Sequence, residues 1–239
     1  MSEATPYRQI RALYDDDTIA VYQAYPPEIA EPALRAGTFV KPFGMSRMTW
    51  IKPSFLWMAY RSGWATKPGQ TRVLRIRVTH EGFEWALSHS CLSHYDRKHH
   101  ASAAAWRTQL HQSPVRIQWD PEQTIHLQPQ PTIRSIQIGL SAEAVPLYVN
   151  DWITSLEDIT EEMHAIHTLT RTSPADAAVQ TPRRTSLPAL SWPSQTNSRN
   201  PVRLAAAPKQ PRSQSRRRPS PATRARRSVP TIRRHRSKP

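Results

Sequence analysis

Cysteine and glycine are scarce in this chain of 239 residues. Cys91 is the only cysteine, so no disulfide can form within the chain, which fits a reducing compartment. The six glycines leave few places for a glycine-rich phosphate loop. The motifs of P-loop ATPases, Rossmann dinucleotide-binding proteins, zincin metalloproteases and α/β-hydrolases are all missing. The sequence therefore gives no support to these four classes of enzyme.

Long apolar segments are also missing. No stretch approaches the roughly 18 apolar residues that a transmembrane helix needs. Residues 1–6 lack the basic and apolar regions of a signal peptide. We therefore expect no membrane partner and an intracellular location, in the cytoplasm or the nucleus.

Acidic and aromatic residues are almost missing from the C-terminal part. Residues 171–239 contain 17 Lys and Arg but one acid, Asp176, whereas residues 1–170 contain 16 basic and 17 acidic residues. The net charge of +15 therefore belongs to the C-terminal part. Trp192 is its only aromatic residue, and 11 of its 69 residues are proline. Because such a segment cannot bury a core, we expect a folded domain at 1–170 and a disordered basic tail at 171–239.

The pattern of apolar residues in the first 170 positions predicts both strands and helices. Polar and apolar residues alternate at 9–14 and 18–22, on either side of three aspartates, which predicts a β-hairpin. Further strands are expected at 47–52, 72–79, 115–119, 124–128 and 133–140. Helices are expected at 26–37, 55–60, 81–92, 101–111, 141–152 and 160–168. This mixture predicts an α+β domain with a split or strongly bent, mainly antiparallel sheet and peripheral helices.

Several segments together resemble a known family. The most distinctive is Met-Thr-Trp-Ile-Lys-Pro-Ser-Phe-Leu-Trp-Met at 48–58. The other matching segments are 10–15, 21–25, 82–87 and 135–140. Through these segments, residues 6–165 closely resemble the domain-of-unknown-function 4291 family of bacteria and fungi. This resemblance brings no established activity with it.

A second resemblance concerns the fold. The expected strand that carries Tyr22 and Gln23, followed by a helix and Gly37, is similar to the opening of ADP-ribosyltransferase-like domains. Residues 47–60 resemble their second nicotinamide-binding element, and Gln137 lies on a strand that often carries their catalytic Glu. The resemblance implies a domain that binds NAD or another nucleotide. It also implies that any enzymatic activity would be ADP-ribose transfer.

Two glutamines depart from that pattern. Gln23 stands where a His would bind the ribose of the cofactor, and Gln137 stands where the Glu would act. A glutamine amide forms hydrogen bonds but cannot carry the negative charge that stabilises an oxocarbenium-like transition state. The resemblance therefore favours nucleotide binding over transfer by the usual mechanism. The two positions that it implies for catalysis are Gln23 and Gln137. The positions that it implies for cofactor binding are Tyr22, Arg47, Trp50, Lys52, Ser54, Tyr60 and Arg61.

The basic residues around the two tryptophans of the 48–58 segment have two interpretations. Arg47, Lys52 and Arg61 flank Trp50 and Trp57. They would form a pocket in which arginine binds phosphate and tryptophan stacks on a base. Alternatively, the tryptophans belong to the core and the basic side chains extend into solvent. The sequence leaves both interpretations open.

A cluster of histidines surrounds the cysteine. His89, Cys91, His94, His99 and His100 lie within 12 residues, but their spacing matches no standard zinc-binding pattern. We therefore expect no metal.

Basic clusters continue along the expected tail, at 216–218, 224–227 and 233–236. Such clusters on a disordered chain suit nonspecific nucleic-acid binding or an import receptor. A solvated tail without a specific partner is the simpler alternative. The second hypothesis for the whole protein is therefore a non-catalytic module that binds nucleic acid or protein and that the tail localises.

Overall fold

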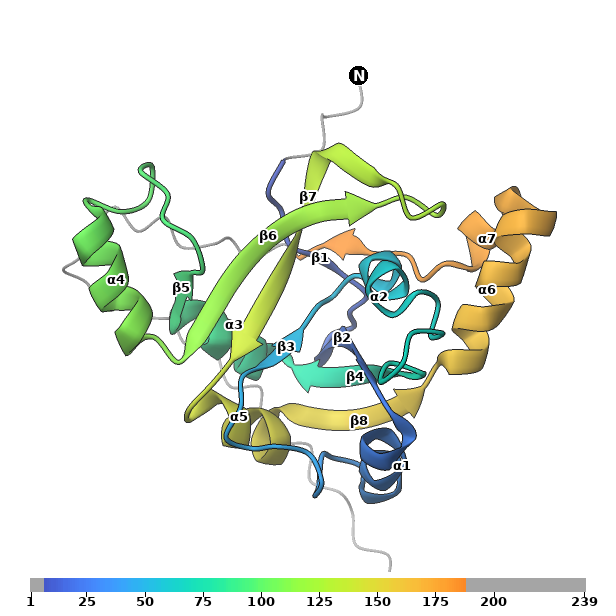
Figure 1. Ribbon diagram of the computed structural model, residues 1–239, viewed down its shortest axis with the longest axis horizontal. Helices are drawn as coiled ribbons and strands as arrows, with labels where there is room; N and C mark the ends of the chain where they lie inside the picture. Colours follow the sequence, from blue (N-terminus) through green and yellow to red (C-terminus); the bar gives the residue numbers. More distant parts are fainter. Residues whose placement is uncertain (1–6, 188–239) are drawn as a thin grey trace, which may run out of the picture. The chain divides into compact units, whose positions relative to one another are not determined.

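Two antiparallel-rich sheets form the centre of the computed structural model, which describes residues 7–187 (Figure 1). The three-stranded sheet has the order β2 (Thr18–Tyr25), β4 (Arg72–Thr79), β8 (Ile153–Asp158). The four-stranded sheet has the order β3 (Thr49–Ile51), β7 (Pro129–Leu140), β6 (Val115–Gln123), β5 (Ser90–Leu92). All neighbouring strands in these sheets are antiparallel except β5 and β6. The sheets meet where the Tyr22 N–H donates a 2.9 Å hydrogen bond to the Lys52 carbonyl.

Helices lie around these sheets (Figure 1). They are α1 (Pro27–Ala36), α2 (Phe55–Ser62), α3 (His80–Ser88), α4 (Ala103–Gln112), α5 (Ala144–Leu147), α6 (Thr160–Thr172) and α7 (Pro174–Gln180). A π-helical turn, η1 (Tyr148–Trp152), follows α5 directly. The prediction of a mixed α+β domain with peripheral helices is confirmed.

Local sequence signals explain where the helices next to the site begin and end. Proline occupies the first turn of α1, and Gly37, with a φ of 73°, ends it in the left-handed conformation that glycine adopts without strain. The Ser54 hydroxyl accepts a hydrogen bond from the Trp57 N–H and caps the start of α2. Both helices were therefore predicted close to their observed bounds.

Three predicted details are wrong. Strand β1 (Arg11–Ala12) pairs with β9 (Thr185–Ser186), and β2 pairs with β4, so the expected hairpin is reduced to one bridge between Tyr14 and Ile19. Residues 124–128 connect β6 to β7 and form no strand, because β6 continues through Pro121 and pairs with β7 instead. Helix α3 ends at Ser88, and β5 follows within the expected helix.

The folded structure also continues past residue 170, where we expected the tail to begin. Helices α6 and α7 and strand β9 occupy most of residues 160–186, and Leu187 is buried in the core. Apart from Leu187, most residues of this segment are small or polar, and they pack through contacts with distant parts of the chain. The prediction of a disordered tail concerns, for residues 188–239, a part of the chain outside the described residues.

Candidate functional site

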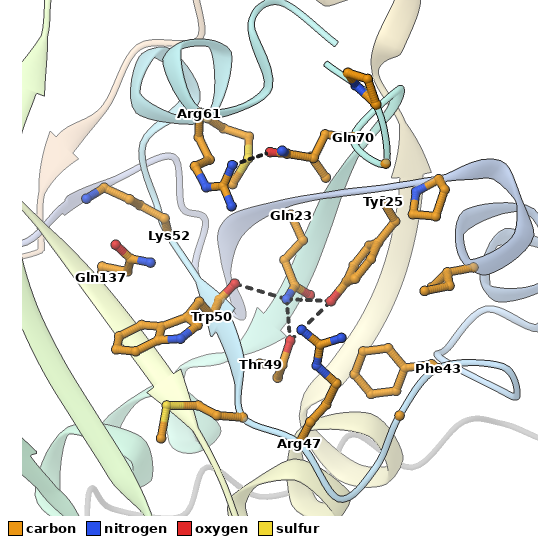
Figure 2. Close-up of a pocket in the computed structure, with 18 of the residues that line it drawn as sticks. Gln23, Tyr25, Phe43, Arg47, Thr49, Trp50, Lys52, Arg61, Gln70 and Gln137 are labelled. Carbon is orange, nitrogen blue, oxygen red and sulfur yellow. Dashed lines mark hydrogen bonds between the residues drawn. The ribbon is translucent and has the colours of Figure 1, made fainter. Parts of the chain in front are cut away.

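A pocket of about 750 Å³ lies beside β2, β3 and α2 (Figure 2). Six of the nine residues proposed from the sequence line it, namely Gln23, Arg47, Trp50, Lys52, Arg61 and Gln137. They come from positions between 23 and 137, so the fold brings together residues that are far apart in the sequence. Its volume lies within the range of about 300–1,000 Å³ that is usual for small-molecule sites.

The other three proposed residues lie outside the lining. Tyr22 is fully buried and packs edge-to-face on Phe55 at 5.9 Å between ring centroids. Ser54 is also fully buried and caps α2. Tyr60 is 48% exposed, and the Lys67 ammonium lies 5.7 Å from the centre of its ring. These residues can support the pocket wall but do not border the cavity.

Gln23 is held by hydrogen bonds at the floor of the pocket (Figure 2). The two N–H groups of its Nε2 are shared among three acceptors, Thr49 Oγ1 at 2.7 Å, Tyr25 OH at 3.0 Å and the Trp50 carbonyl at 3.0 Å. Its Oε1 accepts a 2.8 Å hydrogen bond from the buried Tyr148 hydroxyl. Burial raises the pKa of Tyr148 well above 10 and that of Tyr25 to about 12, so both hydroxyls keep their protons at neutral pH. Gln23 therefore has a structural role in connecting β2, β3 and η1.

Lys52 is 1% exposed and forms a buried ion pair. Its Nζ lies 2.7 Å from Asp120 Oδ2, 3.4 Å from the Ser135 carbonyl and 3.9 Å from the centre of the Trp57 ring. Burial lowers the pKa of Lys52 to about 8, although the Asp120 carboxylate opposes this shift. The amine is committed to these three partners, so its charge is largely neutralised within the protein.

A second buried ion pair lies behind the pocket and was not found from the sequence. Glu122 is 2% exposed, accepts a 2.7 Å hydrogen bond from the Ser54 hydroxyl and pairs with Arg184 at 2.5 Å. Asp120 and Glu122 lie on either side of a register shift in β6, and both carboxylates attract the Lys52 ammonium. The available signal was two acids at alternate positions directly after the expected strand at 115–119. The expected strand at 115–119 ends before both acids, whereas β6 continues to Gln123.

Arg47 and Arg61 differ from Lys52 in having no carboxylate partner within residues 7–187. Arg61 is oriented by a 2.9 Å hydrogen bond from its Nη1 to Gln70 Oε1. Figure 2 shows Arg47 and Arg61 on opposite sides of the pocket, with Gln23 and Tyr25 between them. The described lining contains no Asp or Glu, so these guanidinium groups make the cavity attractive to an anion.

The histidine cluster does not form a metal site in the part of the chain that the structure describes. No three His, Cys, Asp or Glu residues between positions 7 and 187 are grouped closely enough to hold a metal ion. Cys91 Sγ lies 4.0 Å from His100 Nε2, and both residues are buried. Burial raises the pKa of the Cys91 thiol, which disfavours the nucleophilic thiolate.

The helices described here include none that is long and apolar enough to cross a membrane. A search of curated proteins gave no match. The family model described as "Domain of unknown function (DUF4291)" matches residues 9–187. The matched range agrees with the described structure, because the family model and the folded structure both extend through α7 and β9. The match covers most of the sequence, and we conclude that the chain belongs to this domain-of-unknown-function family.

Proposed function

We propose that the pocket binds a nucleotide, with NAD as the first candidate ligand. The observation that carries this proposal is the combination of two arginines without carboxylate partners and an aromatic lining. Arg47 and Arg61 suit phosphate, and Tyr25, Phe43, Trp50 and Trp57 provide apolar or stacking surfaces. The sequence resemblance to ADP-ribosyltransferase-like domains favours NAD over other nucleotides.

The proposal is tested by titrating the full chain with NAD, ADP-ribose and AMP in a calorimeter. The R47Q/R61Q double variant should bind at least about 100-fold more weakly, because each charge-assisted hydrogen bond contributes about 1.5–3 kcal/mol. The matched control is R107Q, which changes an exposed arginine on α4. If none of the three ligands binds, or if R107Q is as weak as the double variant, this function is rejected.

Catalysis by the usual ADP-ribosyltransferase mechanism is not part of this proposal. Gln23 is occupied by its hydrogen-bond network, and Gln137 cannot carry a charge. If the domain is an enzyme at all, ADP-ribose transfer remains the reaction that the resemblance implies. Incubation with NAD labelled in the adenine ring should leave protein and nucleic acid unlabelled, and labelling that Q137L abolishes would contradict this view.

A second candidate function rests on the charge distribution of the sequence. Residues 188–239 contain 14 Lys and Arg and no Asp or Glu, whereas residues 1–187 contain 19 basic and 18 acidic residues. The basic segment would bind nucleic acid nonspecifically or an import receptor, and the folded domain would then be its cargo. This function is compatible with nucleotide binding, because the two use different parts of the chain.

A further inference from the structure

Trp50 and Gly139 make a close contact between β3 and β7. The two residues are directly opposite in the strand register. A Cβ atom at position 139 would lie 2.9 Å from both Cη2 and Cζ3 of Trp50, which is too close for any residue except glycine. The absence of a side chain therefore lets the indole rest on the backbone of β7. Trp50 is half-buried and also borders the cavity.

Gln137 lies on the same face of β7 as Gly139, because the two lie two positions apart along the strand. Figure 2 shows the Gln137 amide beside the Trp50 ring. Its side chain makes no hydrogen bond to any described residue, whereas that of its cross-strand neighbour Gln118 donates to Asp120 at 2.7 Å. Gln137 thus provides an unused donor and an unused acceptor next to an aromatic ring.

We propose that Trp50 and Gln137 form the base-binding subsite of the pocket and that this subsite selects adenine. This inference rests on the proposed function, since it requires that the ligand is a nucleotide. The base stacks on Trp50, and the Gln137 amide pairs with two adjacent atoms on the edge of the base. Gln137 is then a residue for specificity, in place of the catalytic role that the sequence resemblance suggested.

The chemistry of the amide explains the choice of base. Its carbonyl accepts and its NH₂ donates side by side, so it matches a ring edge that offers an amino donor next to a nitrogen acceptor. Adenine has such an edge at its 6-amino group and N7. Stacking by itself tolerates any base, because every base has an aromatic face. A preference between purines that differ only in the 6-amino group would therefore come from the Gln137 carbonyl, which accepts a hydrogen bond from that group.

The test compares two ligands that differ by one amino group. AMP and purine riboside 5′-monophosphate are each titrated into the full chain, with dissociation constants from calorimetry and tryptophan fluorescence. Both ligands carry the same phosphate, so contacts with arginine and with the basic segment cancel in the ratio of affinities. AMP should bind at least about tenfold more tightly, as expected for a lost bidentate pair.

Three variants assign the effect to the subsite. Q137M removes the amide at similar size and should make the two affinities equal. Q112M is the matched control, because Gln112 is an exposed glutamine at the end of α4, and this variant should keep the preference for AMP. G139A should weaken both ligands by similar factors, because its methyl group displaces the Trp50 ring.

Each outcome decides the inference. Equal affinity of the native chain for both ligands overturns it but leaves nucleotide binding intact. A preference for AMP that persists in Q137M also overturns it, because another group then recognises the amino group. If neither ligand binds while NAD does, the subsite is wrong but the proposed function stands. If no nucleotide binds, both fail.

Discussion

At the scale of single residues, the structure separates the side chains that are available to a ligand from those that the protein itself uses. Gln23 and Lys52 both line the pocket, yet their polar atoms are committed to buried partners. Arg47, Arg61 and Gln137 have polar groups that remain available to a bound molecule. Residue type alone does not make this distinction, because it depends on which neighbours the fold supplies.

Lys52 should make stability depend on pH in the alkaline range. Its pKa is about 8 in the folded protein and about 10.5 in the unfolded chain, so the unfolded chain binds more protons between these values. The free energy of unfolding should therefore gain up to about 1.4 kcal/mol per pH unit from this group as the pH rises from 8 to 10.5. Urea unfolding across this range measures the slope.

The pH dependence of unfolding in the native chain is compared with that of K52M, in which an uncharged side chain of similar length replaces the titrating amine. K52M should lose this rise, although its stability is lower at every pH because Asp120 is left unpaired. An identical pH profile in K52M and the native chain would mean that Lys52 has no lowered pKa.

Gln23 should be sensitive to a change that preserves its shape. In Q23E, a buried carboxylate can still accept from Tyr148 but cannot donate to Thr49 or the Trp50 carbonyl. We expect the free energy of unfolding to fall by about 1–3 kcal/mol or more at pH 8. The loss should be smaller at pH 5, where the protonated acid donates again. Urea unfolding at the two pH values measures both effects.

Q112E provides the control for Q23E, since Gln112 is exposed on α4. It should unfold like the native chain at both pH values. Equal stability of Q23E and Q112E would show that the Gln23 amide is not held as the structure describes.

At the scale of elements, the C-terminal segment 181–187 closes the folded domain. Strand β9 pairs with β1, Arg184 neutralises the buried Glu122, and Leu187 enters the core. Glu122 also accepts from Ser54, which caps α2, and α2 supplies Trp57 and Arg61 to the pocket. The segment is therefore connected to one wall of the candidate site through side chains.

Loss of Arg184 should destabilise the domain. R184A removes the closest charged partner of the buried Glu122, and breaking a buried ion pair costs up to about 3–5 kcal/mol. The positive charges of Arg11 and Lys52 still attract the carboxylate, so we expect a loss toward the lower end of this range. The neighbouring Arg183 is exposed, so R183A should have no measurable effect. Thermal and urea unfolding of the two variants decide this prediction, which fails if they are equally stable. Adding E122Q to R184A should recover part of the lost stability.

At the scale of the whole molecule, the two parts of the sequence predict different ionic behaviour. Residues 1–187 are close to neutral, and the 14 basic residues beyond them carry almost all of the net charge. Solubility, salt dependence and nonspecific contacts should therefore follow residues 188–239, whereas ligand selectivity should follow the pocket.

A chain that ends at Leu187 separates these properties. The full chain should bind a 30-base-pair DNA with an affinity that falls steeply with salt, by a slope of about −0.9 for each phosphate that it neutralises. The chain ending at Leu187 should lose this binding but keep its affinity for nucleotides. Fluorescence anisotropy between 50 and 200 mM salt measures the slope. If the two chains bind DNA equally, the basic segment is not the anchor, and if neither binds, the nucleic-acid function is rejected.

The sequence by itself determined the features that depend on local order and composition. These are the charge difference between the two parts, the mixed α+β class, and helices such as α1 and α2 that begin and end at recognisable capping residues. It also indicated six of the residues that line the pocket, through the resemblances of residues 22–37, the 47–61 segment and Gln137. Such features need no knowledge of distant contacts.

The tertiary structure alone decided what depends on pairing between distant segments. It showed that the folded structure continues past 170 and includes residues up to 187, since Arg184 pairs with Glu122 and β9 pairs with β1. It also showed that Gln23 is saturated with hydrogen bonds while Gln137 is not. Burial and hydrogen-bond partners are properties of the packed chain, so no local pattern of residues predicts them.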